Sequence, residues 1–189
     1  PRGASLPEDT VLRNSLVNSE KDRAELTMIV DLIRNDLGRV AEIGSVQVVR
    51  YPRVETLPQV HHLVSDIRCC LRKDVKLAEL LATTFPCGSI TGAPKISAMK
   101  TIAELEPTPR GVYTGSIGTI SLGGDLLLNV AIRSGIVRNS SFTFHSGAGI
   151  VIDSDPQAEY WETLHKASGL WGSAELHIYA NRNTRISAV

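Results

Sequence analysis

The segment Gly111–Asp153, GVYTGSIGTISLGGDLLLNVAIRSGIVRNSSFTFHSGAGIVID, decides the fold class of the chain. It contains three runs rich in apolar and β-branched residues, which favour β-strands. The runs are separated at Gly123-Gly124 and at Asn139-Ser140, pairs that fit the tight turns of β-hairpins. The segment therefore predicts an antiparallel meander.

Helical patterns lie on both sides of this meander. Residues 8–36 predict two helices, and the second is expected to begin at Ser19, because Asp22 three residues later completes a capping-box pattern. A strand is expected within residues 39–56, and further helices are expected at residues 76–84, after Pro94 and after Asp155-Pro156. The helix after Pro94 is expected to bury the side that carries Ile96, Met99 and Leu105. This order predicts an α+β fold rather than alternating βαβ units.

The composition is that of an ordinary globular chain. Of 189 residues, 42% are apolar, and 20 Lys and Arg balance 20 Asp and Glu. A formal net charge of zero gives no electrostatic reason to expect nucleic acid or a membrane surface as a partner. No apolar run reaches spanning length and no signal peptide is recognisable, which predicts a cytoplasmic protein. The three cysteines lack metal-ligand spacing, and the start at Pro rather than Met suggests a fragment or a processed chain.

Two pairs of acidic residues have the spacing of one helix face. Asp22 and Glu25 are three residues apart on an expected helix, and Glu159 and Glu162 repeat that spacing on the last one. If the two faces met, four carboxylates would need a cation, and oxygen-only ligands suit Mg²⁺ best. The alternative is that both pairs favour the helix dipole and stay solvated.

The turn "FPCGSITGAPK", residues 85–95, precedes one of these helices. It is not a nucleotide-binding phosphate loop, because Gly88 and Gly92 are one residue too close and Ala93-Pro94 separates glycine from Lys95. A helix start with many free backbone NH groups still suits an anion, and a carboxylate serves as well as a phosphate. The alternative is a glycine-rich turn that only changes the direction of the chain.

Two basic motifs complete the candidate groups. His61-His62 lies at a loop-to-strand junction, where a histidine can act as general acid or base near neutral pH, although one exposed and one core-satisfied histidine fit equally well. Arg133 is expected inside an otherwise apolar strand, where a guanidinium needs an anionic partner. Together these groups suit a small polyanionic ligand.

Seven motifs follow the order and approximate spacing of the chorismate-utilising enzymes, which include the large subunits of anthranilate synthase and aminodeoxychorismate synthase. They are KDRAELTMIVDLIRNDLGRV, HHLVS, GSITGAPK, GVYTGSIG, NVAIRS, GAGIV and DSDPQAEYWET. Residues 1–170 therefore resemble the chorismate-binding, C-terminal part of such a subunit, and residues 171–189 are expected to be a divergent tail. The resemblance implies an anthranilate-synthase-like fold, with antiparallel sheets flanked by helices, and the N-terminal part of the same subunit as a partner.

The resemblance also implies the roles of individual residues. A Mg²⁺ ion is expected between glutamates and the ring carboxylate of chorismate, with Glu25 and Glu162 as direct ligands and Asp22 and Glu159 as outer acidic partners. His62 falls on the active-site histidine of the family. Lys95 is assigned with it to the catalytic residues, and chorismate is expected to bind at Thr91, Gly92, Tyr113, Arg133, Gly147, Ala148 and Gly149.

The motifs favour one branch of the family. GSITGAPK and LNVAIRS resemble aminodeoxychorismate synthase (para-aminobenzoate synthase, in folate biosynthesis), while PRGAS and GAGIV are as familiar from anthranilate synthases. The expected reaction is amination of chorismate to 4-amino-4-deoxychorismate, with ammonia from a glutamine amidotransferase subunit or domain. Anthranilate synthase, which forms anthranilate and pyruvate in tryptophan biosynthesis, is the alternative. A non-catalytic homologue that acts only in binding is a second one.

Overall fold

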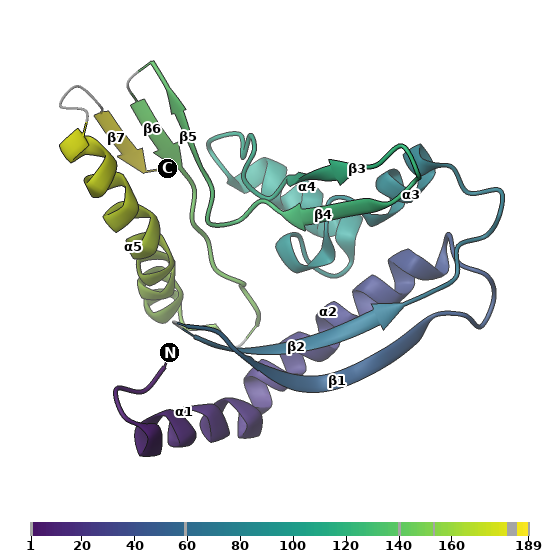
Figure 1. Ribbon diagram of the computed structural model, residues 1–189, viewed down its shortest axis with the longest axis horizontal. Coiled ribbons are helices and arrows are strands. Elements are labelled where there is room, and N and C mark those ends of the chain that lie inside the picture. Colours follow the sequence, from purple (N-terminus) through teal and green to yellow (C-terminus); the bar gives the residue numbers. More distant parts are fainter. Residues whose placement is uncertain (1, 59, 140, 153, 181–184, 189) are drawn as a thin grey trace. The chain divides into compact units, whose positions relative to one another are not determined.

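The computed structural model describes residues 2–58, 60–139, 141–152, 154–180 and 185–188, with side chains only as far as residue 170. The chain divides into two compact units, Pro1–Thr101 and Ile102–Val189. Each unit is described by itself (Figure 1).

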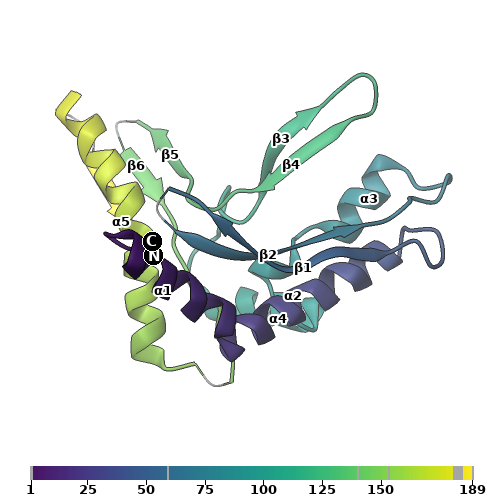
Figure 2. The same cartoon turned by 60° about the horizontal axis from the view of Figure 1, so that its bottom comes forward.

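The first unit packs a long β-hairpin along a helix. Helices α1 (Leu6–Asn18) and α2 (Glu20–Gly38) are followed by the antiparallel strands β1 (Gln47–Thr56) and β2 (His61–Arg68). The hairpin runs beside α2 in both views (Figures 1 and 2). The unit continues with α3 (Leu77–Thr84), the short 3₁₀ turn η1 (Gly88–Ile90) and the beginning of α4 (Lys95–Leu105).

The boundary between the first two helices follows from capping. The hydroxyl of Ser19 accepts a hydrogen bond from the amide of Asp22 at 3.2 Å, so the predicted start of the second helix is confirmed. Ser5 caps α1 in the same way by accepting from the amide of Glu8 at 3.5 Å. Strand β1 is irregular on both sides of Arg50, close to Pro52, which has no NH to give to a ladder.

The second unit contains two hairpins instead of one continuous meander. Strands β3 (Ser116–Ile120) and β4 (Leu126–Val130) form one hairpin, and β5 (Gly135–Arg138) and β6 (Ser141–Phe144) form the other. Both predicted turns are confirmed: Gly124 has φ 96° and Asn139 has φ 50°, whereas Ser140 lies outside the described residues. Residues 145–152 form no strand, although the sequence pattern suggested one.

The last helix is longer than the sequence indicated. Helix α5 (Pro156–Ala180) begins where Asp155-Pro156 predicted, and Asp155 Oδ1 accepts from the amide of Ala158 at 2.7 Å. It continues ten residues into the stretch that showed no periodicity. Strand β7 (Arg185–Ala188) then pairs with β6 in parallel, so this sheet is not purely antiparallel.

The core is small and each unit has its own. Val30, Val40 and Ala41 are buried in the first unit, and Ala131 and Phe144 in the second. The side of α4 expected to be buried is exposed instead, with Ile96 at 70% and Leu105 at 75%. The predicted α+β class is confirmed as mixed helices and small, mainly antiparallel sheets. Within the described residues, no helix combines the length and apolar character that a bilayer crossing requires.

Candidate functional site

In the second unit the loop after β6 packs against the first turns of α5. Ser146 Oγ donates to the carbonyl of Thr163 at 2.9 Å, and Lys166 Nζ donates to the carbonyl of Gly147 at 3.4 Å. Lys166 also forms an ion pair with Glu162 at 2.5 Å, one helical turn away. Lys166 therefore links an expected metal ligand, Glu162, to the expected substrate-binding loop.

Tyr113 lies against the same loop. A Cβ on Gly147 would meet the Tyr113 hydroxyl oxygen at 3.1 Å, so the close approach favours glycine there. The Tyr113 ring stacks on His145, with centroids 5.5 Å apart and planes 11° apart. Burial raises the pKa of the Tyr113 phenol, although the nearby Arg110 opposes this shift. The structure thus brings Tyr113, Gly147 and, through Lys166, Glu162 into one neighbourhood.

Arg110 anchors the approach to Tyr113. Its guanidinium binds Glu106 through two hydrogen bonds of 2.7 and 2.8 Å and lies 3.3 Å from the hydroxyl of Thr114. The bond from Arg110 lowers the pKa of the Glu106 carboxyl. The phenol therefore sits beside a fixed ion pair, which holds the segment before β3 in place.

The two carboxylates of α5 differ in their surroundings. Glu159 is buried, with 6% of its surface exposed, and accepts a hydrogen bond from Ser154 Oγ at 2.8 Å. Glu162 is exposed and is paired with Lys166. Because they are three residues apart on a helix, both project from one face, as the sequence predicted.

The first unit carries the other acidic pair on α2. Asp22 and Glu25 are half-buried, and Glu25 lies 3.7 Å from Lys21. Among the described residues, neither unit by itself groups three or more His, Cys, Asp or Glu side chains in the manner of a metal site. The available donors are carboxylate oxygens, which fit Mg²⁺ in kind. The magnesium ligand set stays a prediction.

The turn before α4 is closed by hydrogen bonds between its own residues. Thr91 Oγ1 donates to the carbonyl of Cys87 at 3.1 Å, and Gly92 has φ 148°, in the region that favours glycine. Gly88 is buried against α2, where an added Cβ would come within 2.4 Å of Leu32 Cδ2. The carbonyl of Pro94 accepts from the amide of Ala98, so Pro94 stands just before the helix and not inside it.

Lys95 has a partner that the sequence did not indicate. Its ammonium group lies 2.5 Å from Asp36 Oδ2 near the end of α2, and only 14% and 9% of the two side chains are exposed. The lysine thereby fastens the start of α4 to α2. Its assignment to the catalytic residues stays a prediction, and the observed contact is an ion pair within the first unit.

The two adjacent histidines face opposite sides of strand β2. His62 is exposed, whereas His61 is buried and hydrogen-bonded through both ring nitrogens. The structure therefore has one exposed and one core-satisfied histidine, and the role of a histidine of this pair as general acid or base stays a prediction. The exposed one is His62, the residue assigned to the active site.

The prediction that Arg133 lies within a strand is wrong. Arg133 is exposed in the connection between β4 and β5, with φ 52°, a conformation that does not continue a strand. The ladder of the first hairpin ends at Val130. Gly147, Ala148 and Gly149 lie in the loop before α5, where Gly149 is exposed.

Sequence reasoning missed several residues of these neighbourhoods. Lys166 could have been found from its position four residues after Glu162, which places both on one helix face. His145 and Ser146 precede a quoted motif by one or two residues but show no pattern of their own. Asp9, whose carboxylate lies 3.0 Å from His61 Nε2, carries no sequence signal, because the two residues are 52 positions apart in the chain.

Comparison with known proteins identifies the family to which this chain belongs. Residues 1–172 match the family described as chorismate binding enzyme, and the chain belongs to that family. Over 175 residues it is 45% identical to anthranilate synthase component 1 of Aquifex aeolicus, covering 93% of this chain and 35% of that protein. It is also 45% identical over 175 residues to aminodeoxychorismate synthase component 1 of Bacillus subtilis, covering 93% of this chain and 37% of that one.

A solved structure confirms the fold. Anthranilate synthase component I from Streptococcus pneumoniae superposes with a TM-score of 0.79 at 45% sequence identity, covering 87% of this chain and 38% of that chain. The fold is therefore the anthranilate synthase fold expected from the motifs. The chain spans little more than a third of the length of these relatives.

Proposed function

We propose that the protein containing this chain aminates chorismate to 4-amino-4-deoxychorismate. The observation that carries the proposal is the family match over residues 1–172, in which the acidic pairs, His62 and the Gly147 loop are all present. The motifs GSITGAPK and LNVAIRS favour this branch. Relatives of both branches are equally similar, so anthranilate synthesis is the second candidate.

In this proposal the residues of the second unit bind the substrate. The loop Gly147–Gly149 and the phenol of Tyr113 receive chorismate, whose two carboxylates suit the exposed guanidinium of Arg133. The family resemblance assigns Thr91 and Gly92 to the same substrate. His62, which is exposed on β2, moves a proton at or near the ring.

Magnesium fits the acidic residues that the family resemblance assigns to it. Glu25 and Glu162 would hold the ion, with Asp22 and Glu159 behind them. When bound, Mg²⁺ neutralises a substrate carboxylate and polarises the conjugated ring, which helps the loss of a poor hydroxyl leaving group. Lys21 and Lys166 now pair with Glu25 and Glu162, so metal binding must compete with two lysines.

The proposal includes partners. Ammonia comes from a glutamine amidotransferase subunit or domain, because the chain shows no glutaminase nucleophile motif. The relatives extend well beyond the matched region, and the N-terminal part of the same subunit is expected to take part in the activity. A cytoplasmic location is part of the same prediction.

The test uses the protein as its gene encodes it, incubated with chorismate, Mg²⁺ and ammonium, with products separated by chromatography. Formation of aminodeoxychorismate without release of pyruvate supports the proposal. Anthranilate together with pyruvate would assign the protein to the second candidate. No product, even with a glutaminase partner present, would leave the non-catalytic binding protein as the conclusion.

A further inference from the structure

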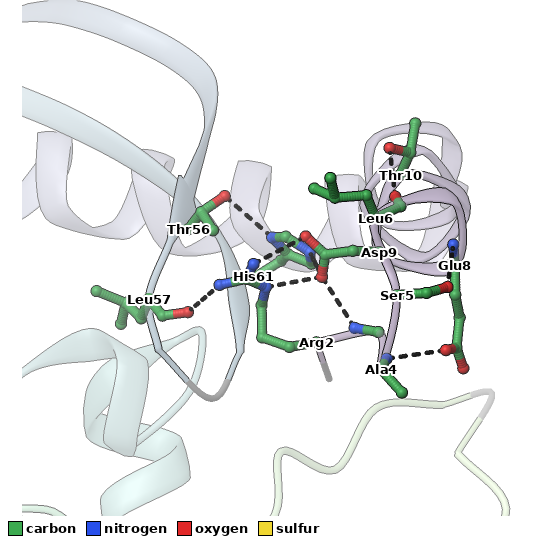
Figure 3. A network of polar contacts seen from close by, with 11 residues as sticks. Arg2, Ala4, Ser5, Leu6, Glu8, Asp9, Thr10, Thr56, Leu57 and His61 are labelled. Atoms are coloured by element: carbon green, nitrogen blue, oxygen red, sulfur yellow. Dashed lines mark hydrogen bonds and ion pairs between the residues drawn. The ribbon is translucent and has the colours of Figure 1, made fainter.

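A compact polar network ties the start of the chain to the β1–β2 hairpin. Figure 3 shows Asp9 of α1 pointing at His61, the first residue of β2, with Arg2 beside Asp9 and reaching the carbonyl of Leu57. His61 Nε2 lies 3.0 Å from Asp9 Oδ1, and His61 Nδ1 lies 3.0 Å from the hydroxyl of Thr56. Arg2, Asp9, Thr56 and His61 are called the His61 clamp below.

Arg2 holds the clamp together from the other side. Its guanidinium binds both oxygens of Asp9, at 2.7 and 2.9 Å, and donates a further hydrogen bond to the carbonyl of Leu57 at 2.9 Å. The amide of Gly3 adds a bond of 2.9 Å to Asp9. The carboxylate is therefore fixed before it meets the histidine.

The clamp fixes both the orientation and the tautomer of His61. A carboxylate only accepts hydrogen bonds, so Nε2 of His61 carries a hydrogen and donates it to Asp9. In the neutral ring Nδ1 is then left to accept from Thr56, its cross-strand partner. Only 2% of the His61 side chain is exposed, and a ring held at both nitrogens cannot turn without breaking a bond.

His62 follows His61 in the chain and is joined to it by a peptide bond. Successive side chains of a strand point to opposite faces, so the packing that anchors His61 sets the direction in which His62 leaves β2. The short connection before it is closed by a bond of 2.9 Å from the amide of Leu57 to the carbonyl of Val60. Within the part of the chain that the structure describes, the side chain of His62 makes no hydrogen bond or ion pair. The position of this side chain therefore depends on the backbone of β2.

We propose that the His61 clamp positions His62 for proton transfer, an inference that rests on the function proposed above. His61 is a positioning residue: it is buried away from the exposed face and acts through its neighbour. Displacement of a reacting group by about 1 Å can lower a rate on the order of 100-fold, so a loosened strand end is costly. A clamp that only stabilised the fold would leave turnover unchanged in the folded protein.

The experiment compares His61→Leu with His61→Gln in the full-length protein. Glutamine keeps an NH that can reach Asp9, whereas leucine fills the space without any donor. Below the unfolding temperature of both variants, we expect kcat of His61→Leu to fall about tenfold or more while KM for chorismate stays within about twofold. We expect His61→Gln to recover most of that loss. Arg68→Ala, at the far end of β2, is the matched control and should leave kcat unchanged.

Nuclear magnetic resonance of the protein labelled with ¹⁵N-histidine gives a second readout that needs no turnover. We expect the ring signals of His62 to shift or broaden in His61→Leu and to stay unchanged in Arg68→Ala. If wild-type protein forms no product from chorismate, the proposed function fails, and this measurement still tests the positioning. An unaltered His62 signal, unaltered kcat in His61→Leu, or equal losses with glutamine and leucine would overturn the inference.

Discussion

Asp9 illustrates how one side chain gains a role from a fixed environment. The hydrogen bond from Arg2, followed by that from the amide of Gly3, holds the pKa of the Asp9 carboxyl well below its usual range. Because this pKa is lowered in the folded state, the ionised carboxyl stabilises the fold at any pH above the ordinary carboxyl pKa of about 4. That stabilisation is lost as the pH falls below this value. The stabilisation by Asp9 is thus complete at neutral pH.

Asp9→Asn should therefore lower the unfolding temperature most at neutral pH. The gap between wild type and variant should narrow progressively below about pH 4, because the carboxyl of the unfolded chain then takes up a proton. Circular dichroism melting curves between pH 7 and pH 2 measure this gap. Asp31→Asn, which removes an exposed pair with Arg34, is the control and should have little effect at any pH. A gap independent of pH would contradict the argument.

The Lys95–Asp36 pair leads to a second prediction about single residues. Asp36→Asn leaves a mostly buried ammonium without its carboxylate and should lower the free energy of unfolding by about 3–5 kcal/mol. The double variant Asp36→Leu/Lys95→Met removes both charges and should recover most of that loss. Chemical denaturation of the wild type, the single variant and the double variant, with Arg34→Gln as an exposed control, measures these losses. Equal destabilisation of the single and double variants would show that the charges themselves are unimportant.

Sequence reasoning proposed His62, Glu159 and Glu162 as site residues from motif and spacing, but it could not indicate contacts between residues far apart in the chain. Lys95–Asp36 and Asp9–His61 join residues 59 and 52 positions apart, and no local pattern encodes such pairs. The expected strand position of Arg133 failed for a different reason. The apolar run around it is continuous in sequence, while a backbone turn at positive φ interrupts it in space.

At the scale of elements, the β3–β4 hairpin depends on one glycine. Gly118 pairs with Leu128, and a Cβ built on it would lie 1.9 Å from the carbonyl oxygen of Leu127. Gly118→Ala should therefore separate the two strands and expose their amides. Hydrogen exchange measured by mass spectrometry should show faster exchange of β3 and β4, with β5 and β6 unchanged.

Gly169 provides the matched control in the same unit. It lies inside α5, and nothing lies within 4 Å of the place its Cβ would occupy. Gly169→Ala should stabilise the helix by about 0.5–1 kcal/mol, because glycine loses more backbone freedom on folding than alanine. A Gly118→Ala protein that exchanges as slowly as Gly169→Ala would contradict the predicted clash.

The elements themselves were largely predictable, because caps and turns are local. Ser19, Asp155 and Gly124 act within three residues of their own positions, and each predicted boundary is found. The continuation of α5 to Ala180 and the parallel pairing of β7 were not predictable in this way. Neither has a signal of its own in the sequence, since the stretch after Leu170 shows no clear periodicity.

For the whole molecule, an amphipathic pattern shows that a face is apolar but not what covers it. Ile96 and Leu105 follow a helical period, yet both are exposed on α4. Phe144, by contrast, is almost fully buried at 2% exposure. Burial depends on neighbours distant in sequence. The spacing of the apolar residues therefore predicted that residues 95–105 form a helix, but it did not predict what this helix contacts.

The proposed use of a single magnesium ion gives a prediction for the whole protein. The family resemblance assigns Glu25 on α2 and Glu162 on α5 to the same ion. Glu25→Gln and Glu162→Gln should each lower kcat/KM by about 100-fold or more, and the double variant should be little worse than either one, because the first change already removes the metal-dependent step. Steady-state rates with chorismate and ammonium over a range of Mg²⁺ concentrations measure this.

The control and the contrary outcome make this test specific. Glu20→Gln removes an exposed carboxylate from the first turn of α2 and should leave the magnesium dependence unchanged. Circular dichroism of each variant separates loss of function from loss of fold. If the fold-losses in kcat/KM of the two single variants multiply in the double variant, the two glutamates act independently. Residues that hold one ion would not behave in this way, because the first substitution already removes the ion. The proposed ligand set would then be wrong, while the membership of the chorismate binding family would stand on the match alone.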